Sequence, residues 1–277
     1  MKYYFSYIRV LFIVAIFLFT RDLSSQVRTR NNEYNPEQGQ EGKDVRWFPT
    51  PQELVDKMLD MAKITSSDFL VDLGSGDGRT VISAAKRGVH SIGIEFNPDL
   101  VTLSRKNAAD EGVSDKAEFI KADLFSYDFS KATVVTMFLL PEINLRLRPK
   151  LLEMKPGTRV VSTTFTMQNW QYDEVVRIDD KTSKWTTAFL WIVPAKMAGT
   201  WEFNGRELKL NQQFQMVTGE LTLGGKNFKI TGGKVTGTDL TFIAGGIRYY
   251  CNLKENKLEI KATENGKSHI WTAIKQK

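Results

Sequence analysis

The sequence has few residues of the kinds that build disulfides or metal sites. It contains a single cysteine, Cys251, and only two histidines, His90 and His269. One cysteine cannot form an internal disulfide, so a disulfide-stapled fold is excluded. A structural zinc site takes about four Cys or His ligands, and we therefore predict no metal site.

Strongly biased composition is also absent. Hydrophobic residues make up 42% and charged residues 25% of the 277 residues. This balance is ordinary for a globular protein and excludes collagen-like, low-complexity and multi-span membrane proteins. The net charge is +6, and the last 81 residues contain 12 lysines and arginines against 7 acidic residues. Single lysines spread along a segment favour solubility over nucleic-acid binding, so we expect no nucleic-acid partner.

One apolar run stands near the N-terminus, where Lys2 and Arg9 precede the residues VLFIVAIFLF. The run is shorter than the roughly 20 residues of a membrane span, and a small-residue cleavage site follows at Ser25. We predict that residues 1–25 are a signal peptide or a membrane anchor acting through residues 5–20. The expected protein is membrane-associated or exported, with the side of the membrane left open. The polar residues 26–44 are predicted to be a flexible linker.

Residues 45–195 alternate between apolar runs typical of strands and amphipathic stretches typical of helices. Thr50, Pro51 and Glu53 have the pattern of a capping box at the start of the first helix. This alternation predicts a three-layer α/β domain with a mostly parallel sheet. The seven expected strands are 69–73, 91–95, 117–122, 133–138, 158–162, 175–178 and 186–193.

Residues 196–277 lose the helical pattern and alternate apolar with polar residues between glycine-rich turns. This pattern predicts a separate antiparallel β domain, either a small barrel or a curled meander. Its expected core aromatics are Trp201, Phe214, Phe228, Phe242, Tyr250 and Trp271.

The segment VDLGSGDGR, residues 71–79, carries the strongest functional signal. A strand ends there in a loop containing Gly74, Ser75, Gly76 and Gly78, and glycines allow positive φ and close approach of a ligand. Position 79 is arginine, whereas a dinucleotide fingerprint requires glycine there. Asp72, two residues before the first glycine, suits a ligand with an ammonium group.

Two further acids follow at the ends of the next two strands. Glu95 is placed to accept the two hydroxyls of a ribose, as acids at this point of a doubly wound sheet do. Asp123 is placed to accept a hydrogen bond from an exocyclic amine such as that of adenine. Together with the glycine loop, these acids describe a nucleoside with a cationic tail.

These motifs resemble those of a class I S-adenosylmethionine-dependent methyltransferase over residues 45–193. The segments FPTP, DLGSGDGRTVISAA, GIEFNPDLV and VVTMFLLPEINLRLRPKLLEMKPGTRVVS are similar to one group of lysine methyltransferases. That group includes the mitochondrial enzymes acting on the ATP synthase c-subunit and on the adenine nucleotide translocase, with bacterial relatives. The glycine loop is also similar to that of the non-SET histone lysine methyltransferase.

The resemblance implies a cofactor, S-adenosylmethionine, and a set of residues that hold it. Asp72 and the loop Gly74–Gly78 would hold the methionine part, and Glu95 the ribose. Asp123 and the backbone of Leu124 would hold the adenine. Thr50 of FPTP would close over the cofactor, although a plain helix cap explains this residue equally well.

The same resemblance places the methyl acceptor at the segment MFLLPEIN, residues 137–144. Tentative acceptor residues are Phe138, Pro141, Glu142 and Trp170, with Phe165 and Tyr172 as further aromatics and the core as the preferred place for Phe165. The motif Asn/Asp-Pro-Pro-Phe/Tyr, typical of enzymes that act on nucleic-acid bases, is absent. The implied reaction is methylation of a lysine in a protein, which could be a membrane protein. Alternatives are a small molecule or lipid head group as acceptor, or a non-catalytic cofactor-binding module. No general base is assigned.

Overall fold

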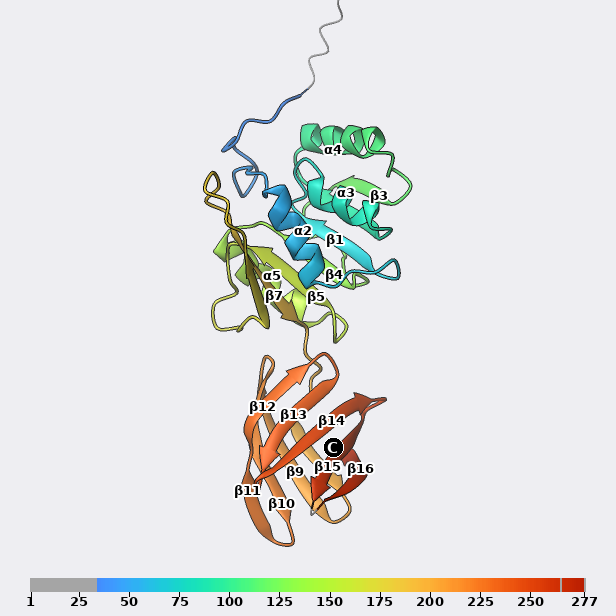
Figure 1. The fold of residues 1–277 in the computed structure, drawn as a ribbon, viewed down its shortest axis with the longest axis vertical. Coiled ribbons are helices and arrows are strands. Elements are labelled where there is room, and N and C mark those ends of the chain that lie inside the picture. The colour runs from blue at the N-terminus through green and yellow to red at the C-terminus, as the bar shows by residue number, and fades with distance from the viewer. Residues whose placement is uncertain (1–33, 265, 277) are drawn as a thin grey trace, which may run out of the picture. The chain divides into compact units, whose positions relative to one another are not determined.

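The computed structural model describes residues 34–264 and 266–276, and residues 36–277 form one compact unit. Two sheets dominate this unit, one mixed with helices and one purely antiparallel (Figure 1). The first sheet belongs to residues 69–192 and the second to residues 199–275. The predicted fold class, a methyltransferase-like sheet followed by an all-β region, is therefore confirmed.

The first sheet has seven strands in the order β3-β2-β1-β4-β5-β7-β6. Its first five members run parallel, and β7 pairs antiparallel with both β5 and β6. The bounds are β1 Phe69–Leu73, β2 His90–Glu95, β3 Ala117–Lys121, β4 Val134–Met137, β5 Arg159–Thr163, β6 Glu174–Arg177 and β7 Thr187–Ile192. All seven strands were predicted, with ends within two residues of these.

Helices cover both faces of this sheet because successive strand residues point to opposite sides. Leu70, Val134 and Val161 share a buried cluster with α2. Their neighbours Val71 and Val135 share another cluster with α5. The helices are α2 Gln52–Met61, α3 Arg79–Lys86, α4 Pro98–Asp110 and α5 Pro141–Leu152.

The capping box predicted at Thr50 is wrong. The N-cap of α2 is Pro51, and no side chain caps the helix. Thr50 is buried, and its carbonyl oxygen accepts a hydrogen bond from Arg79 at 2.8 Å. The start of α2 is thus fixed by a guanidinium from the next helix rather than by a local cap.

The antiparallel sheet closes into a barrel. Its strands follow the order β10-β12-β13-β14-β15-β16-β8-β9, and the pairing of β9 with β10 closes the barrel. The other side of β10 is shared: β12 pairs with its first residues and β11 with its last four. Closure leaves these strands without a free edge. The bounds are β8 Gly199–Phe203, β9 Arg206–Gln213, β10 Met216–Leu223, β11 Lys226–Lys229, β12 Thr231–Thr236, β13 Asp239–Ala244, β14 Ile247–Lys254, β15 Lys257–Glu264 and β16 Lys267–Lys275.

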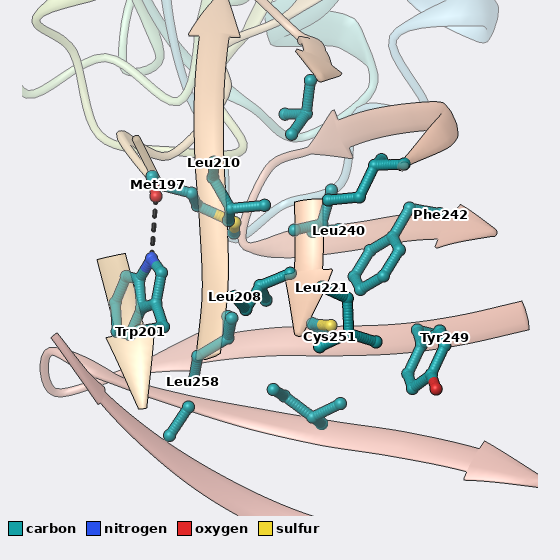
Figure 2. Packing of buried hydrophobic residues seen from close by; sticks show 14 of the residues in the cluster. Met197, Trp201, Leu208, Leu210, Leu221, Leu240, Phe242, Tyr249, Cys251 and Leu258 are labelled. Atoms are coloured by element: carbon teal, nitrogen blue, oxygen red, sulfur yellow. Dashed lines mark hydrogen bonds between the residues drawn. The ribbon is translucent and has the colours of Figure 1, made fainter. Parts of the chain in front are cut away.

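Alternate residues of the barrel strands fill its interior with apolar side chains (Figure 2). Trp201 is buried there, and its indole N–H donates to the carbonyl oxygen of Met197 at 2.9 Å. Two expected core aromatics lie elsewhere. Tyr250 is 54% exposed and its neighbour Tyr249 is buried, because a strand alternates sides at every residue. Phe214 packs against the core of the first sheet.

The prediction of a membrane-associated or exported protein has to be corrected. Within the described residues, no helix is long and apolar enough to cross a membrane. The apolar run at residues 10–19, on which that prediction depended, lies outside the described part of the chain.

Candidate active site

A pocket of about 510 Å³ opens at the carboxyl ends of the parallel strands. Ligand sites in open α/β sheets form at this edge. Four of the predicted cofactor residues line it: Gly74, Glu95, Asp123 and Leu124. The predicted acceptor residue Phe138 lines it as well. The order of the strands, β3-β2-β1-β4, brings these residues together from segments distant in sequence.

The glycine loop between β1 and α3 is tightly enclosed. Gly76 has a φ of +54°, and a Cβ on it would lie 2.5 Å from the indole nitrogen of Trp47. Gly78 has a φ of +86°, and a Cβ there would lie 2.7 Å from the ring of Phe119. No larger residue fits either position without movement of its neighbours. The loop is therefore closely packed, and its amides are paired within the protein: Gly74 and Ser75 donate to the carbonyl oxygen of Ile94, and Gly78 donates to that of Ser75.

Asp72 is buried behind the loop rather than in the pocket lining. Its carboxylate accepts a hydrogen bond from the hydroxyl of Thr136 at 2.7 Å. Burial raises the pKa of Asp72 to about 7, and the negative charges of Glu95 and Asp77 act in the same direction. A buried acid with this pKa favours a cationic partner, which would return it to its charged form.

Glu95 connects the end of β2 to the glycine loop. Its carboxylate accepts hydrogen bonds from the backbone amides of Gly76 at 2.9 Å, Phe96 at 2.8 Å and Asn97 at 2.9 Å. A carboxylate offers about four lone-pair positions, so Glu95 has room for about one more donor in this arrangement. It cannot accept both hydroxyls of a ribose unless a backbone bond gives way.

Asp123 already has a cationic partner. The ammonium group of Lys43 lies 2.6 Å from its carboxylate and 4.6 Å from the ring centroid of Phe96. The hydrogen bond from Lys43, followed by one from the backbone of Phe125, holds the pKa of Asp123 below its usual value. An adenine amine that used the same carboxylate would have to share it with Lys43 or displace it.

Residues 40–48 form one wall of the pocket, which corrects the prediction of a flexible linker for its last part. Backbone hydrogen bonds close this segment on itself, from Gly39 to Trp47 at 2.8 Å and from Trp47 to Gln40 at 3.0 Å. The polar composition hid this role because the segment packs through only a few side chains, among them Trp47 and Phe48.

Aromatic rings line the end of the pocket near the acceptor segment. Trp185 lies at their centre, with ring centroids 5.3 Å from Phe138, 5.7 Å from Phe48 and 6.2 Å from Phe165. All four line the pocket, including Phe165, for which the core was preferred. Sequence reasoning missed Trp185, since it lies in the connection between β6 and β7, outside every recognised motif. We define these four residues as the aromatic mouth.

The loop that carries Phe165 is held by two buried side chains. The amide of Asn144, in the first turn of α5, donates to the carbonyl oxygen of Phe165 at 3.3 Å and to the hydroxyl of Ser162 at 3.2 Å. That hydroxyl donates to the same carbonyl oxygen at 2.9 Å. Asn144 is the last residue of the MFLLPEIN segment, so this segment touches the acceptor end through its asparagine.

Other predicted acceptor residues lie outside the pocket lining. Trp170 is fully buried in the core and stacks on Phe214, which corrects its placement at the acceptor site. Pro141 and Glu142 begin α5, and the Glu142 side chain is exposed. Tyr172 is exposed and packs on Phe189.

The comparisons with known proteins agree with this geometry. Residues 72–174 match the model of the ANTKMT methyltransferase domain. A protein-lysine N-methyltransferase of Saccharolobus islandicus is 41% identical over 152 residues, which cover 54% of this chain and 94% of that protein. The human lysine N-methyltransferase of the ATP synthase c-subunit is 44% identical over 107 residues, covering 38% of this chain and 46% of the relative. The chain thus spans about half the length of that human relative.

A solved structure points to the same cofactor but to another acceptor. It is named an RNA methyltransferase from Salinibacter ruber in complex with S-adenosyl-L-homocysteine, and it is 47% identical with a TM-score of 0.51. The similarity covers 54% of this chain and 96% of that one. Both the Saccharolobus and the Salinibacter proteins match only about half of this chain.

Fold, pocket and relatives together define an S-adenosylmethionine-dependent methyltransferase. More narrowly, the chain belongs to the same family as the Saccharolobus protein-lysine N-methyltransferase, and its residues 72–174 match the ANTKMT methyltransferase domain. S-adenosylmethionine is its cofactor, as the likeness to a relative with bound S-adenosyl-L-homocysteine indicates.

Proposed function

We propose that the protein transfers a methyl group from S-adenosylmethionine to the side-chain amine of a lysine in a protein substrate. The aromatic mouth carries this proposal. Rings from four separate segments converge around Trp185 at the end of the pocket. An apolar aromatic channel fits the long aliphatic stem of lysine and disfavours the charged form of its amine.

The cofactor residues that we propose are those of the glycine loop and the strand ends. Asp72 would face the ammonium group of the methionine part, and the loop Gly74–Gly78 would enclose that part. Glu95 would accept from the ribose after partial release of its backbone bonds. Asp123 and Leu124 would hold the adenine. The remaining acceptor candidate from the sequence, Phe138, belongs to the aromatic mouth.

Methyl transfer from a sulfonium is an in-line displacement, and the cofactor supplies the reactive methyl group. The protein has to bring donor and acceptor into line, which by itself lowers the barrier substantially. It also has to deliver a neutral amine, because an ammonium has no lone pair. The aromatic mouth would confine the lysine stem and favour the neutral amine, whose proton passes to solvent before transfer. As the amine nitrogen bonds the methyl carbon, the bond from that carbon to sulfur breaks and S-adenosyl-L-homocysteine leaves.

The names of the relatives support a protein substrate. The Saccharolobus relative is named a protein-lysine N-methyltransferase, and this chain covers nearly all of it. Other relatives are named for the ATP synthase c-subunit and for the adenine nucleotide translocase. We therefore propose membrane proteins as the first substrates to test.

RNA is the second candidate acceptor because the Salinibacter relative is named an RNA methyltransferase. The experiment that separates the two candidates supplies radiolabelled S-adenosylmethionine with a cell extract as the source of acceptors. We expect label in protein that survives ribonuclease and disappears when the extract's lysines are acetylated beforehand. Label that ribonuclease removes would overturn the lysine proposal.

A variant of the aromatic mouth tests the carrying observation. Trp185→Ala should lower kcat/KM for the protein acceptor at least about tenfold, since one missing ring leaves the amine poorly aligned. Its affinity for the cofactor should stay near that of the unsubstituted protein. Tyr250→Ala, which removes an exposed aromatic side chain of the barrel outside the pocket, is the matched control. Equal activity of the two variants would contradict the assignment of the mouth.

A further inference from the structure

The segment between β5 and β6, residues 164–173, carries one ring of the aromatic mouth, Phe165. It leads directly into the β6–β7 hairpin, whose connection carries a second ring, Trp185. Thr164 and Gln168 both have left-handed backbone, with φ of +67° and +54°. Such conformations are strained for non-glycine residues and persist only where surrounding contacts enforce them.

Contacts from the first sheet and its helix hold part of this segment. Arg148 of α5 donates to the carbonyl oxygen of Met167 at 3.0 Å and to the side chain of Asn169 at 2.6 Å. The indole N–H of Trp191 in β7 donates to the carbonyl oxygen of Trp170 at 2.9 Å. These bonds fix the middle of the segment from one side.

The barrel contacts the second half of the same segment. The ring of Phe214 stacks on Trp170, with centroids 6.0 Å apart and planes 18° apart. The side-chain amide of Gln215 donates to the carbonyl oxygen of Gln171 at 2.6 Å. Lys234 of β12 forms an ion pair with Asp173 at 2.8 Å. Residues 170, 171 and 173 each have a barrel partner.

The barrel presents these partners from a preformed turn. Phe214 and Gln215 form the connection between β9 and β10, and Phe214 has a φ of +54°. The amide of Gln212 donates to the carbonyl oxygen of Phe214 at 2.7 Å. Val235 donates its backbone N–H to the carbonyl oxygen of Gln215 at 2.7 Å. Gln215 itself is 1% exposed. These hydrogen bonds hold the turn in the conformation that contacts residues 170 and 171.

We propose that the barrel positions the acceptor end of the active site, with Phe214 and Gln215 as positioning residues for Phe165 and Trp185. The barrel thereby controls alignment of the acceptor and leaves cofactor binding to the first sheet. This inference rests on the proposed function of the aromatic mouth. The last 81 residues then influence catalysis, although they contain none of the methyltransferase motifs.

The test compares full-length variants. Phe214→Ala should reduce kcat/KM for the acceptor at least about tenfold, because displacement by about 1 Å can cost a hundredfold. It should leave the dissociation constant of S-adenosylmethionine unchanged. Phe214→Tyr keeps the ring and should restore activity. Phe228→Ala is the matched control, since Phe228 in β11 packs against the barrel core and its ring lies beside Gly245.

A second readout, amide hydrogen exchange, needs no acceptor. Phe214→Ala should lose protection over residues 164–173 and in the β6–β7 hairpin, whereas Phe228→Ala should not. Kinetics are measured on whichever acceptor, protein or RNA, the unsubstituted protein methylates. If the protein methylates RNA but no lysine, the proposed function is wrong, and the effect of Phe214→Ala on hydrogen exchange and kcat/KM still tests the role of the barrel. Unchanged exchange and unchanged kcat/KM in Phe214→Ala would overturn the inference.

Discussion

The buried acid Asp72 makes the free energy of unfolding depend on pH in an unusual direction. Burial raises its pKa from 3.8 to about 7 in the folded protein. The folded state therefore holds this proton more tightly than the unfolded state does. Stability from this group is fully present below pH 4 and is lost as the pH rises toward 7. A difference of about three pH units corresponds to about 4 kcal/mol.

The substitution Asp72→Asn removes the ionisation while keeping an oxygen that can accept from Thr136. Relative to the unsubstituted protein, the variant should gain about 4 kcal/mol in free energy of unfolding between pH 4 and pH 8. Urea denaturation at a series of pH values measures this difference, in which the other carboxylates cancel. A difference that does not change with pH would refute the reasoning.

Asp68 serves as the control with the opposite sign. Burial alone would raise its pKa, but hydrogen bonds from Thr133, the backbone of Thr65 and Arg159 lower it below the usual value. Its contribution to stability is present above the ordinary pKa and is lost as the pH falls through the folded value. Asp68→Asn should therefore cost stability at neutral pH and cost less in acid.

Cofactor binding should report the same proton. If the ammonium of S-adenosylmethionine faces Asp72, binding returns the carboxylate to its charged form and releases a proton below pH 7. Calorimetric titrations in two buffers of different ionisation enthalpy should detect close to one released proton at pH 6. At pH 8 they should detect a net uptake of less than one proton, because part of the free α-amine is neutral there and gains a proton to bind as the ammonium. Asp72→Asn should bind weakly and release none. Equal proton release by the two proteins would place the ammonium elsewhere.

Three further predictions follow from the site and the barrel. Gly76→Ala should abolish measurable cofactor binding, because its Cβ would lie 2.5 Å from Trp47, whereas Gly112→Ala, also at positive φ but with nothing within 4 Å, should bind normally in the same titration. Glu95→Ala should weaken cofactor binding by about 1–3 kcal/mol, and unchanged affinity would mean that the ribose lies elsewhere. Burial raises the pKa of the Cys251 thiol, so maleimide should label it only after unfolding, and rapid labelling of the folded protein would contradict the barrel core.

The sequence predicted the first sheet closely because its strands are short and bounded by strong turn signals. The central strands β1 and β4 are nearly continuous buried runs, and the glycine loop identifies the edge where the ligand binds. The strand ends also predicted that Asp72, Glu95 and Asp123 lie near that edge. The ion-pair partner of Asp123 could not be predicted, since Lys43 comes from a polar segment that no local pattern connects to the pocket.

Errors arose where long-range packing decides the role of a residue. Trp170 and Phe165 lie in one loop, and only tertiary structure sends the first to the core and the second to the pocket. Tyr249 and Tyr250 are adjacent, so a register error of one residue exchanges buried and exposed. Phe214 lies in a turn of the barrel but packs on another sheet, which period-two alternation cannot show.

The change from helical to strand-like pattern near Pro194 predicts that the two parts fold separately. A chain that ends at Ala195 should keep cofactor affinity, and the isolated residues 197–277 should unfold cooperatively with a β-rich spectrum. The contacts of Phe214 and Gln215 add a distinction between two activities. The truncated protein should bind the cofactor but transfer methyl groups poorly.

The central claim, methylation of a protein lysine, is tested most directly by mass spectrometry of native proteins. Cells that carry the gene are compared with cells from which it has been deleted, and with deleted cells that express Trp185→Ala. The account predicts at least one polypeptide that loses the mass of one or more methyl groups on deletion, mapped to a lysine and not restored by the variant. An unchanged set of methylated lysines, together with loss of a methylated base in RNA, would contradict it.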